Sequence, residues 1–382
     1  MAKDRLWGRN FVLVFLAAWG FYLAHQLVLP VLPLFVTQAG GSVLFAGTVN
    51  AAYLLLAVLT NLQMPSVLAD RDRRPVFLVG LVLLAAGTLV YPLTGTLVAV
   101  LLLTVVRGVG WGVATVAGNT TVSEIVPASR RGEGLGYYGL AQTMALLTGT
   151  GTGLLLVEQF GFAAAFMAAG FSGAVAVAVA AAMHPVLPNR QLTTPALGMR
   201  GAFRDPHLLL PALTFALLTT AYGGVVSFTA LYLLETGLGN PAAFFFVGSV
   251  ANVVARPLAG RLSDRVGAAT LVAPGCLLAL LGIFALTFAP GPGWPLLAAG
   301  LFGVGFGTVV VSTHIILVEG VGAQHRAVGN AMYSTAFNGG IGAGALLLGA
   351  VADAAGYTSM FVLAAVSLIA SLAIFLLGRK YT

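Results

Sequence analysis

The stretch Arg107–Gly112, RGVGWG, returns at residues 302–307 as FGVGFG, a shift of 195 residues along the chain. Further positions follow this shift or one of 194, charged ones among them: Glu124 with Glu319, Arg131 with Arg326, Gly161 with Gly356, and residues 68–71 (LADR) with residues 262–265 (LSDR). Matches between single glycines carry little weight in a chain with 49 of them, but repeated charged positions make chance a poor explanation. The sequence therefore predicts two equivalent halves.

Composition indicates a membrane protein. Only 8% of the 382 residues are charged and 59% are hydrophobic, whereas soluble proteins carry about 25% charged residues, and this excludes an ordinary soluble enzyme. Apolar runs bounded by charges, glycine or proline begin near Phe11, Leu44, Val76, Leu97, Leu135, Ala163, Leu208, Ala242, Ala268, Trp294, Ala327 and Tyr357. Since one crossing needs about 20 residues, we expect an all-α membrane protein with twelve transmembrane helices in two pseudo-symmetric six-helix bundles. The expected bundles are residues 1–184 and 207–382, joined by a cytoplasmic linker at 185–206.

The distribution of lysine and arginine predicts the orientation. The net charge is +7, and the basic residues gather in alternate connections, at 3–9, 71–74, 130–131, 190–204, 261–265, 326 and 379–380. The opposite turns carry Glu158, Glu235 and Asp353 without lysine or arginine. Because cytoplasmic loops are richer in positive charge, we expect both termini in the cytoplasm. The basic residues form no single stripe of the kind that favours nucleic acid.

Two motifs resemble those of a known family. Residues 260–267, GRLSDRVG, resemble the G-x-L-x-D-R-x-G loop motif of the major facilitator superfamily, and residues 107–112 resemble the motif of its fourth helix. The first copy of the loop motif has Ser66 in place of glycine and lacks a loop glycine, and residues 149–153, GTGTG, replace the Gly-Pro of the fifth-helix motif. The resemblance covers essentially the whole chain, and within the family the chain is most similar to the twelve-helix bacterial drug and metabolite exporters, which are drug:proton antiporters.

This resemblance implies secondary active transport by alternating access, in which two bundles rock around a central site. It implies that helices 1, 4, 7 and 10 line the cavity, which adds Tyr222 and Phe306 to the expected binding residues. It also assigns gating to the loop motifs, where glycine permits a tight turn and an aspartate can pair with basic groups or a helix N-terminus. The expected gating residues are Asp70, Arg71, Gly260, Asp264, Arg265 and Arg256. The alternative for the loop charges is topology and solubility, and for Arg256 it is a structural role.

Arg107 is the expected substrate-binding cation. None of the eleven acidic residues lies mid-helix, so the ionisable residues inside the spans are basic. An arginine in hydrocarbon costs about 2.5 to 3.5 kcal/mol and should face a wet cavity or a partner. Arg107 lies one turn from Trp111 and can bind an anionic group with two donors, and the alternative is a structural clamp. His25, with an ordinary pKa of about 6.5, is the expected proton carrier, and a hydrogen-bonded packing histidine is the alternative.

Further residues are expected around the substrate. Trp19, Tyr22 and Gln26 share one helical face at spacings of three and four, which suits either an aromatic cavity wall or core packing. Gln142 and Asn338 lie on repeat-related helices and are additional polar candidates.

Together these features predict a transporter of a bacterial inner membrane that exports small organic molecules, anionic ones included, using the proton gradient. The second reading is an uptake symporter or uniporter for a small anionic metabolite. A remote third is an intramembrane serine protease, because residues 170–173, GFSG, match a nucleophile pattern for which His25 or His314 could supply the base. Neither a phosphate-binding loop nor clustered metal ligands occur in the sequence, so we expect no enzyme activity and no cofactor. The expected partners are the small-molecule substrate, protons and the lipid bilayer.

Overall fold

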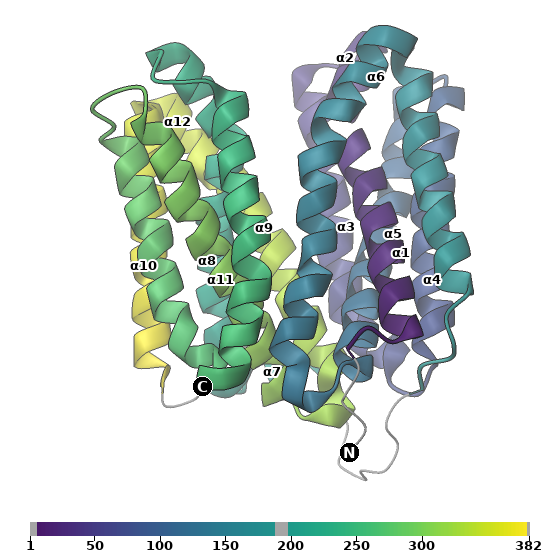
Figure 1. The fold of residues 1–382 in the computed structure, drawn as a ribbon. Coiled ribbons are helices and arrows are strands. Elements are labelled where there is room, and N and C mark those ends of the chain that lie inside the picture. The colour runs from purple at the N-terminus through teal and green to yellow at the C-terminus, as the bar shows by residue number, and fades with distance from the viewer. Residues whose placement is uncertain (1–5, 188–197, 380–382) are drawn as a thin grey trace. The chain divides into compact units, whose positions relative to one another are not determined.

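The computed structural model describes residues 6–187 and 198–379, and every regular element in these ranges is helical (Figure 1). The first half contains α1 (Arg9–Val28), α2 (Val31–Gln38), α3 (Val43–Leu68), α4 (Arg73–Val90), α5 (Leu97–Ile125) and α6 (Arg131–Ala181). The second half contains α7 (Met199–Ala202), α8 (Pro206–Thr236), α9 (Pro241–Val266), α10 (Ala268–Thr287), α11 (Trp294–Gly320) and α12 (Arg326–Leu377). Short 3-10 turns are η1 (Tyr91–Leu93), η2 (Ala128–Arg130) and η3 (Ala323–His325).

The membrane spans follow from helix length. In the described ranges, 10 helical segments are long and apolar enough to cross a membrane. Two of the helices, α6 and α12, have 51 and 52 residues, or about 75 Å, whereas a bilayer core is about 30 Å thick. Each is interrupted by one glycine with a positive φ, Gly161 at 82° and Gly356 at 81°, a conformation that glycine adopts without strain. Each long helix therefore supplies two crossings, and the expected twelve-span, all-helical fold is confirmed.

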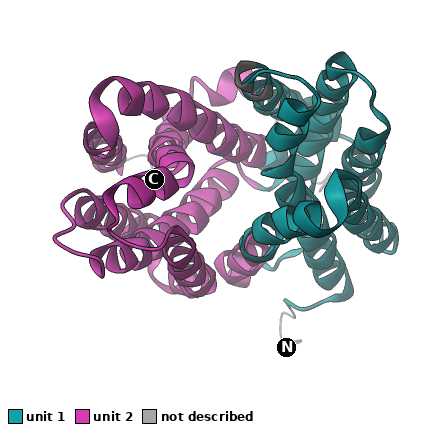
Figure 2. Cartoon of the chain, turned by 90° about the horizontal axis from the view of Figure 1, so that it is seen from above, with its two compact units in different colours: residues 1–127, 141–195, 323–327 teal, residues 128–140, 196–322, 328–382 magenta. Residues whose placement is uncertain are grey.

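The chain divides into two compact units (Figure 2). Unit 1 comprises Met1–Pro127, Ala141–Pro195 and Ala323–Ala327, and unit 2 comprises Ala128–Leu140, Ala196–Gly322 and Val328–Thr382. Residues 188–197 of the expected linker lie outside the described residues, and α7 lies in the rest of it. The bundle limits 1–184 and 207–382 stay a prediction.

The repeated glycines lie where helices touch. In unit 1, a Cβ on Gly110 of α5 would lie 3.0 Å from the carbonyl oxygen of Gly80 in α4. In unit 2, a Cβ on Gly305 of α11 would lie 2.5 Å from the carbonyl oxygen of Gly275 in α10. Membrane helices associate through such close packing of small residues, because lipid supplies no hydrophobic drive between them. The duplicated sequence therefore encodes duplicated helix packing.

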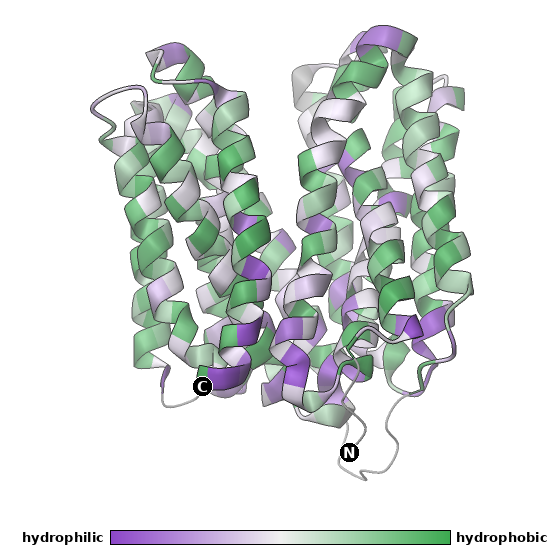
Figure 3. Cartoon of the chain, viewed as in Figure 1, coloured by the Kyte–Doolittle hydropathy of each residue, from purple (hydrophilic) through white to green (hydrophobic). Residues whose placement is uncertain are grey.

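The surfaces of the helices are mainly apolar, and hydrophilic residues gather toward helix ends (Figure 3). Large apolar side chains such as Leu102 and Leu154 are exposed within spans. Exposed apolar side chains at these positions suit contact with lipid, and the protein is a multi-pass membrane protein.

The single cysteine of the chain, Cys276, is buried in α10. Its Sγ lies 3.9 Å from the Oγ of Ser371 in α12. The chain therefore forms no internal disulfide.

Candidate binding site

The side chain of Arg107 extends from α5 into the interior of unit 1, and the residue is 2% exposed. Its guanidinium carbon lies 5.7 Å from the ring centre of Tyr53 in α3 and 5.2 Å from that of Tyr91 in η1. Its Nη1 donates to the Tyr91 hydroxyl at 3.3 Å, while Nε is buried without a hydrogen-bond partner. A Cβ on Gly87 of α4 would lie 2.7 Å from Cγ of Arg107, so this glycine makes room for the side chain. Among the described residues, no carboxylate forms an ion pair with Arg107.

His25 lies beside this arginine. Its Nδ1 shares a hydrogen bond of 3.0 Å with the Tyr53 hydroxyl, and its ring centre lies 4.2 Å from that of Trp111. The Trp111 ring also meets Tyr22 edge-on at 5.5 Å. Tyr53 therefore contacts both ionisable side chains, as a hydrogen-bond partner of His25 and as an aromatic face for Arg107.

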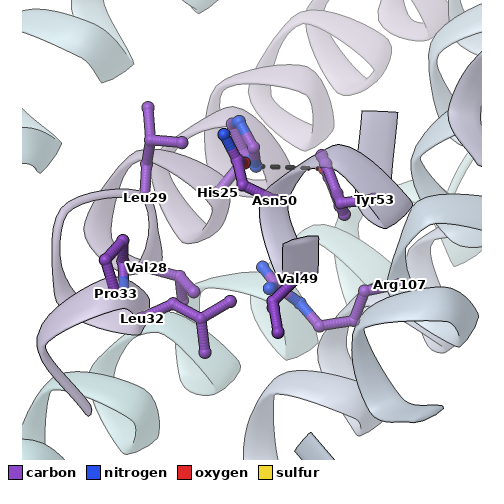
Figure 4. A pocket seen from close by; sticks show the side chains of 9 residues that line it. All are labelled: His25, Val28, Leu29, Leu32, Pro33, Val49, Asn50, Tyr53 and Arg107. Carbon is purple, nitrogen blue, oxygen red and sulfur yellow. Dashed lines mark hydrogen bonds between the residues drawn. The ribbon is translucent and has the colours of Figure 1, made fainter. Parts of the chain in front are cut away.

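A pocket opens beside these side chains (Figure 4). It encloses about 360 Å³, part of which is open to the surroundings. Its polar wall consists of His25, Asn50, Tyr53 and Arg107, and its apolar wall consists of Val28, Leu29, Leu32, Pro33 and Val49. The pocket combines one fixed positive charge with an apolar surface.

The pocket lies at a break in the first membrane span. Helix α1 ends at Val28 and α2 begins at Val31, with Pro30 at the N-cap position and Pro33 in the first turn. Proline has no backbone N–H, so these two residues remove helical hydrogen bonds between the end of α1 and the start of α2. The end of α1 and the first turn of α2 supply most of the apolar wall of the pocket.

Five expected residues of unit 1 do not line this pocket: Trp19, Tyr22, Gln26, Trp111 and Gln142. Nε1 of Trp19 and Oε1 of Gln26 are buried without a partner among the described residues. A Cβ on Gly149 of α6 would lie 2.7 Å from Cβ of Gln26, so that face of α1 packs on α6. Gln142 is half-buried in α6.

Sequence reasoning missed Asn50, Tyr53 and Tyr91. Asn50 and Tyr53 share a face of α3 at a spacing of three, a signal that was available in the sequence. Tyr91 lies in the η1 turn after α4, where no helical periodicity points to it.

The residues expected in unit 2 form an aromatic stack. The rings of Tyr222 and Phe306 are parallel with centres 4.1 Å apart, and Phe302 continues the stack 6.0 Å from Phe306. Asn338 is buried in α12 at 5% exposure. Phe302 occupies the repeat position of Arg107, so unit 2 has an aromatic ring where unit 1 has a charge.

Ser172, the candidate serine nucleophile, lies at a contact between two helices. The Ser172 hydroxyl donates to the carbonyl oxygen of Gly20 at 2.8 Å and so joins α6 to α1. His25 shares its hydrogen bond with Tyr53, and His314 shares one of 2.7 Å with Asn330. Ser172 therefore serves helix packing, and both histidines have hydrogen-bond partners other than this serine.

The second loop motif contacts the start of α6 within unit 2. The Asp264 carboxylate accepts hydrogen bonds from the backbone N–H groups of Gly132 at 2.7 Å and Glu133 at 2.9 Å. The Arg261 Nε lies 3.1 Å from the Glu133 carboxylate. Gly260 allows this approach, because a Cβ there would collide with the carbonyl oxygen of Gly132. A carboxylate at a helix N-terminus is stabilised by the helix dipole.

Arg256 lies one turn before Gly260 and is 3% exposed. Its Nε donates to Oδ1 of Asn252 at 2.8 Å and its Nη1 to the Gly139 carbonyl at 2.6 Å. The Arg265 side chain is exposed. Arg256 therefore joins α9 to the first turns of α6.

The first loop motif is built differently. In the described part of the chain, the Asp70 carboxylate accepts no hydrogen bond, and the Arg71 side chain is exposed. Asp72 instead caps α4 by accepting from the Arg74 N–H at 3.0 Å. Arg73 forms a buried ion pair with Glu124 at 2.8 Å and donates to the Arg71 carbonyl at 2.6 Å. The first motif thus lacks the loop glycine, and its capping carboxylate is that of Asp72, two residues after Asp70.

Comparison with known proteins assigns the family. Residues 14–345 match the family model described as Major Facilitator Superfamily. Multidrug resistance protein MdtG of Citrobacter koseri is 25% identical over 341 residues, covering 83% of this chain and 82% of that protein. The uncharacterized MFS-type transporter YtbD of Bacillus subtilis is 26% identical over 343 residues, covering 85% and 84%. The crystal structure of the human organic anion transporter MFSD10 (TETRAN) matches with a TM-score of 0.76 at 20% identity, covering 96% of this chain and 99% of that chain.

The chain belongs to the major facilitator superfamily, whose members carry small-molecule substrates through membranes. The family expected from the loop motif is thereby confirmed. The human structure, at its low identity, supports the fold alone.

Proposed function

We propose that this transporter exports small organic molecules, anionic ones included, by alternating access, and that the proton gradient drives export. It lies in the inner membrane of a bacterium with both termini in the cytoplasm, and it has no enzymatic activity. The names of the MdtG relatives, multidrug resistance proteins, support export, as does the GRLSDRVG loop. The distribution of basic residues supports the orientation.

The observation that favours an anionic substrate is the environment of Arg107. It is a buried cation with a donor, Nε, that no described group accepts. An unsatisfied buried donor costs about 1 to 3 kcal/mol, more when it is charged, and an anionic ligand would remove that cost. In this proposal the wider path of the substrate includes Trp19, Tyr22, Gln26, Trp111 and Gln142 of unit 1, and Tyr222, Phe306 and Asn338 of unit 2.

His25 is the proposed proton carrier. The other histidine in a span, His314, shares its hydrogen bond with an asparagine, whereas His25 lines the pocket that contains Arg107. We expect His25→Gln, which keeps a polar side chain but cannot titrate, to remove the dependence of transport on the imposed pH gradient. Unchanged proton dependence in this variant would exclude His25 from the role.

Gating is proposed for the loop motifs. Asp264, Gly260 and Arg256 support it through their contacts with the start of α6, which can form in one state and break in another. Arg265 completes the motif. Asp70 and Arg71 keep the same proposed role in the first motif.

Transport in proteoliposomes tests the substrate class. A panel of organic anions, neutral compounds and organic cations is offered to the purified protein under an imposed pH gradient. We expect anions to be moved and Arg107→Gln to reduce their transport. A clear preference for cations would overturn the assignment.

The second candidate is an uptake symporter or uniporter for a small anionic metabolite. The positive charge of the site favours it, because a proton on His25 adds a second positive charge next to Arg107. An anion and a proton would then help each other to bind, whereas exchange requires that they compete. The direction of transport under an imposed pH gradient separates the two candidates.

A further inference from the structure

The free edge of the Arg107 guanidinium limits the kind of anion that fits. Nη1 is engaged by the Tyr91 hydroxyl, whereas Nε is buried and unpartnered and no described group accepts from Nη2. The donors without a partner among the described residues are therefore the parallel N–H bonds of the Nε–Nη2 edge. Two parallel donors match the two oxygens of a carboxylate in one plane.

The guanidinium is held in place before any ligand arrives. The rings of Tyr53 and Tyr91 lie within 5.7 Å and 5.2 Å of its carbon, and His25 fixes the Tyr53 hydroxyl at 3.0 Å. A donor that is already oriented loses little conformational freedom on binding, so it favours a ligand of matching geometry.

The rest of the pocket limits the charge and the body of the ligand. Among the described lining residues, Arg107 is the one with a permanent charge, and Val28, Leu29, Leu32 and Val49 form an apolar wall. While His25 is neutral, a second negative charge on the ligand would be desolvated without a charged partner, which is costly. Asn50 is an exposed residue that also lines this pocket, and its amide can donate to a ligand oxygen (Figure 4).

We propose that the pocket in unit 1 is a subsite for organic monocarboxylates with a short apolar body. The carboxylate lies side-on against Nε and Nη2 of Arg107, Asn50 donates to it, and the apolar body lies on the wall formed by the α1–α2 break. Tyr53 and Tyr91 are positioning residues that hold the guanidinium. This assignment rests on the proposed recognition of an anion by Arg107, and it narrows that anion to one class.

Equilibrium binding to the purified full-length protein in lipid nanodiscs tests the assignment. The probes are hexanoate, hexanamide, hexylphosphonate and adipate, and Trp111, next to His25, supplies a fluorescence signal beside calorimetry. We expect hexanoate to bind the wild-type protein, and the other three to bind at least about tenfold more weakly. Arg107→Lys keeps the charge but loses the two-donor edge, so we expect about a tenfold or greater loss for hexanoate. Asn50→Leu should cause a smaller, severalfold loss.

The control is Arg74→Lys, an arginine of unit 1 that contacts the Ala181 carbonyl and should bind hexanoate as the wild type does. Thermal unfolding of each variant shows whether it is folded. Hexanoate binding unchanged in folded Arg107→Lys would overturn the two-donor geometry. Equal or tighter binding of hexylphosphonate or adipate would overturn the monocarboxylate class and leave anion recognition standing. Binding of none of the anions, together with transport of cations, would overturn the proposed function as well.

Discussion

The two units place different chemistry on the same helix packing. Ser172 donates to the Gly20 carbonyl in unit 1 and Ser367 to the Leu217 carbonyl in unit 2, both at 2.8 Å. Aligning the units on this contact places His25 on Tyr222. The two rings then occupy equivalent positions. The ring centre of His25 lies 4.2 Å from that of Trp111, and the ring centre of Tyr222 lies 4.1 Å from that of Phe306, the repeat counterpart of Trp111.

The position of Arg107, in contrast, carries a charge only in unit 1. Arg107 corresponds to Phe302 under the 195-residue shift, and Tyr53 corresponds to Gly248. Unit 1 thus has a cation with its aromatic support, and unit 2 has a ring in a stack. Small residues at helix contacts are thus kept in both units, whereas the residues of the proposed binding pocket differ between them.

The largest expected effect comes from erasing this difference. Arg107→Phe gives unit 1 the residue found in unit 2, and we expect anion transport to fall at least about thirtyfold, because losing one member of a buried charge pair costs about 2 to 5 kcal/mol. Transport rates in proteoliposomes measure the loss. The matched variant Phe302→Leu should change the rate only severalfold. Similar losses in both variants would mean that the charge does not distinguish the units.

The shared packing predicts that corresponding glycines have similar effects on stability. Gly110→Ala and Gly305→Ala should each lower stability by about 1 to 3 kcal/mol, since the new Cβ meets backbone within 3.0 Å. Thermal unfolding in detergent checks this. Gly151→Ala is the control, because a Cβ there has open space around it. A stable Gly305→Ala variant beside an unstable Gly110→Ala variant would show that the packing is not equivalent.

The smallest effects separate the two loop motifs. Asp264→Ala removes the acceptor for two N–H groups of α6 and should cost about 1 kcal/mol, the value typical of a helix cap. Asp70→Ala should stay within about 0.5 kcal/mol, as expected for an exposed carboxylate that accepts no hydrogen bond from the described residues. Both thermal stability and the transport rate are measured. A larger cost for Asp70→Ala would mean that the first motif supplies the gating contact in another state.

The sequence was sufficient for the scaffold because its signals are local or repeated. Long apolar runs predict spans, and the repeat of the RGVGWG stretch predicts two equivalent halves. The site needed tertiary information. Arg107 could be identified as a candidate because an arginine in lipid is energetically costly. The aromatic rings that contact its guanidinium, Tyr53 and Tyr91, come from other helices and share no periodicity with it.

The face of α1 shows the limit of periodicity. Trp19, Tyr22 and Gln26 do share a helical face, as spacing predicts, but Gln26 packs against α6 and does not reach the pocket. Spacing defines which residues lie together on a helix. It does not define which neighbour that face meets, because this depends on how six helices pack at once.

The enclosure of Cys276 has a practical consequence. Thiol-reactive dyes added to either side of a vesicle should find no accessible native target, because this sulfur lies between α10 and α12. A cysteine introduced at exposed Glu158 or Asp353, turn positions 195 residues apart, would then report alone on the compartment it faces. The wild-type chain is in this sense already a background-free template for mapping its own topology.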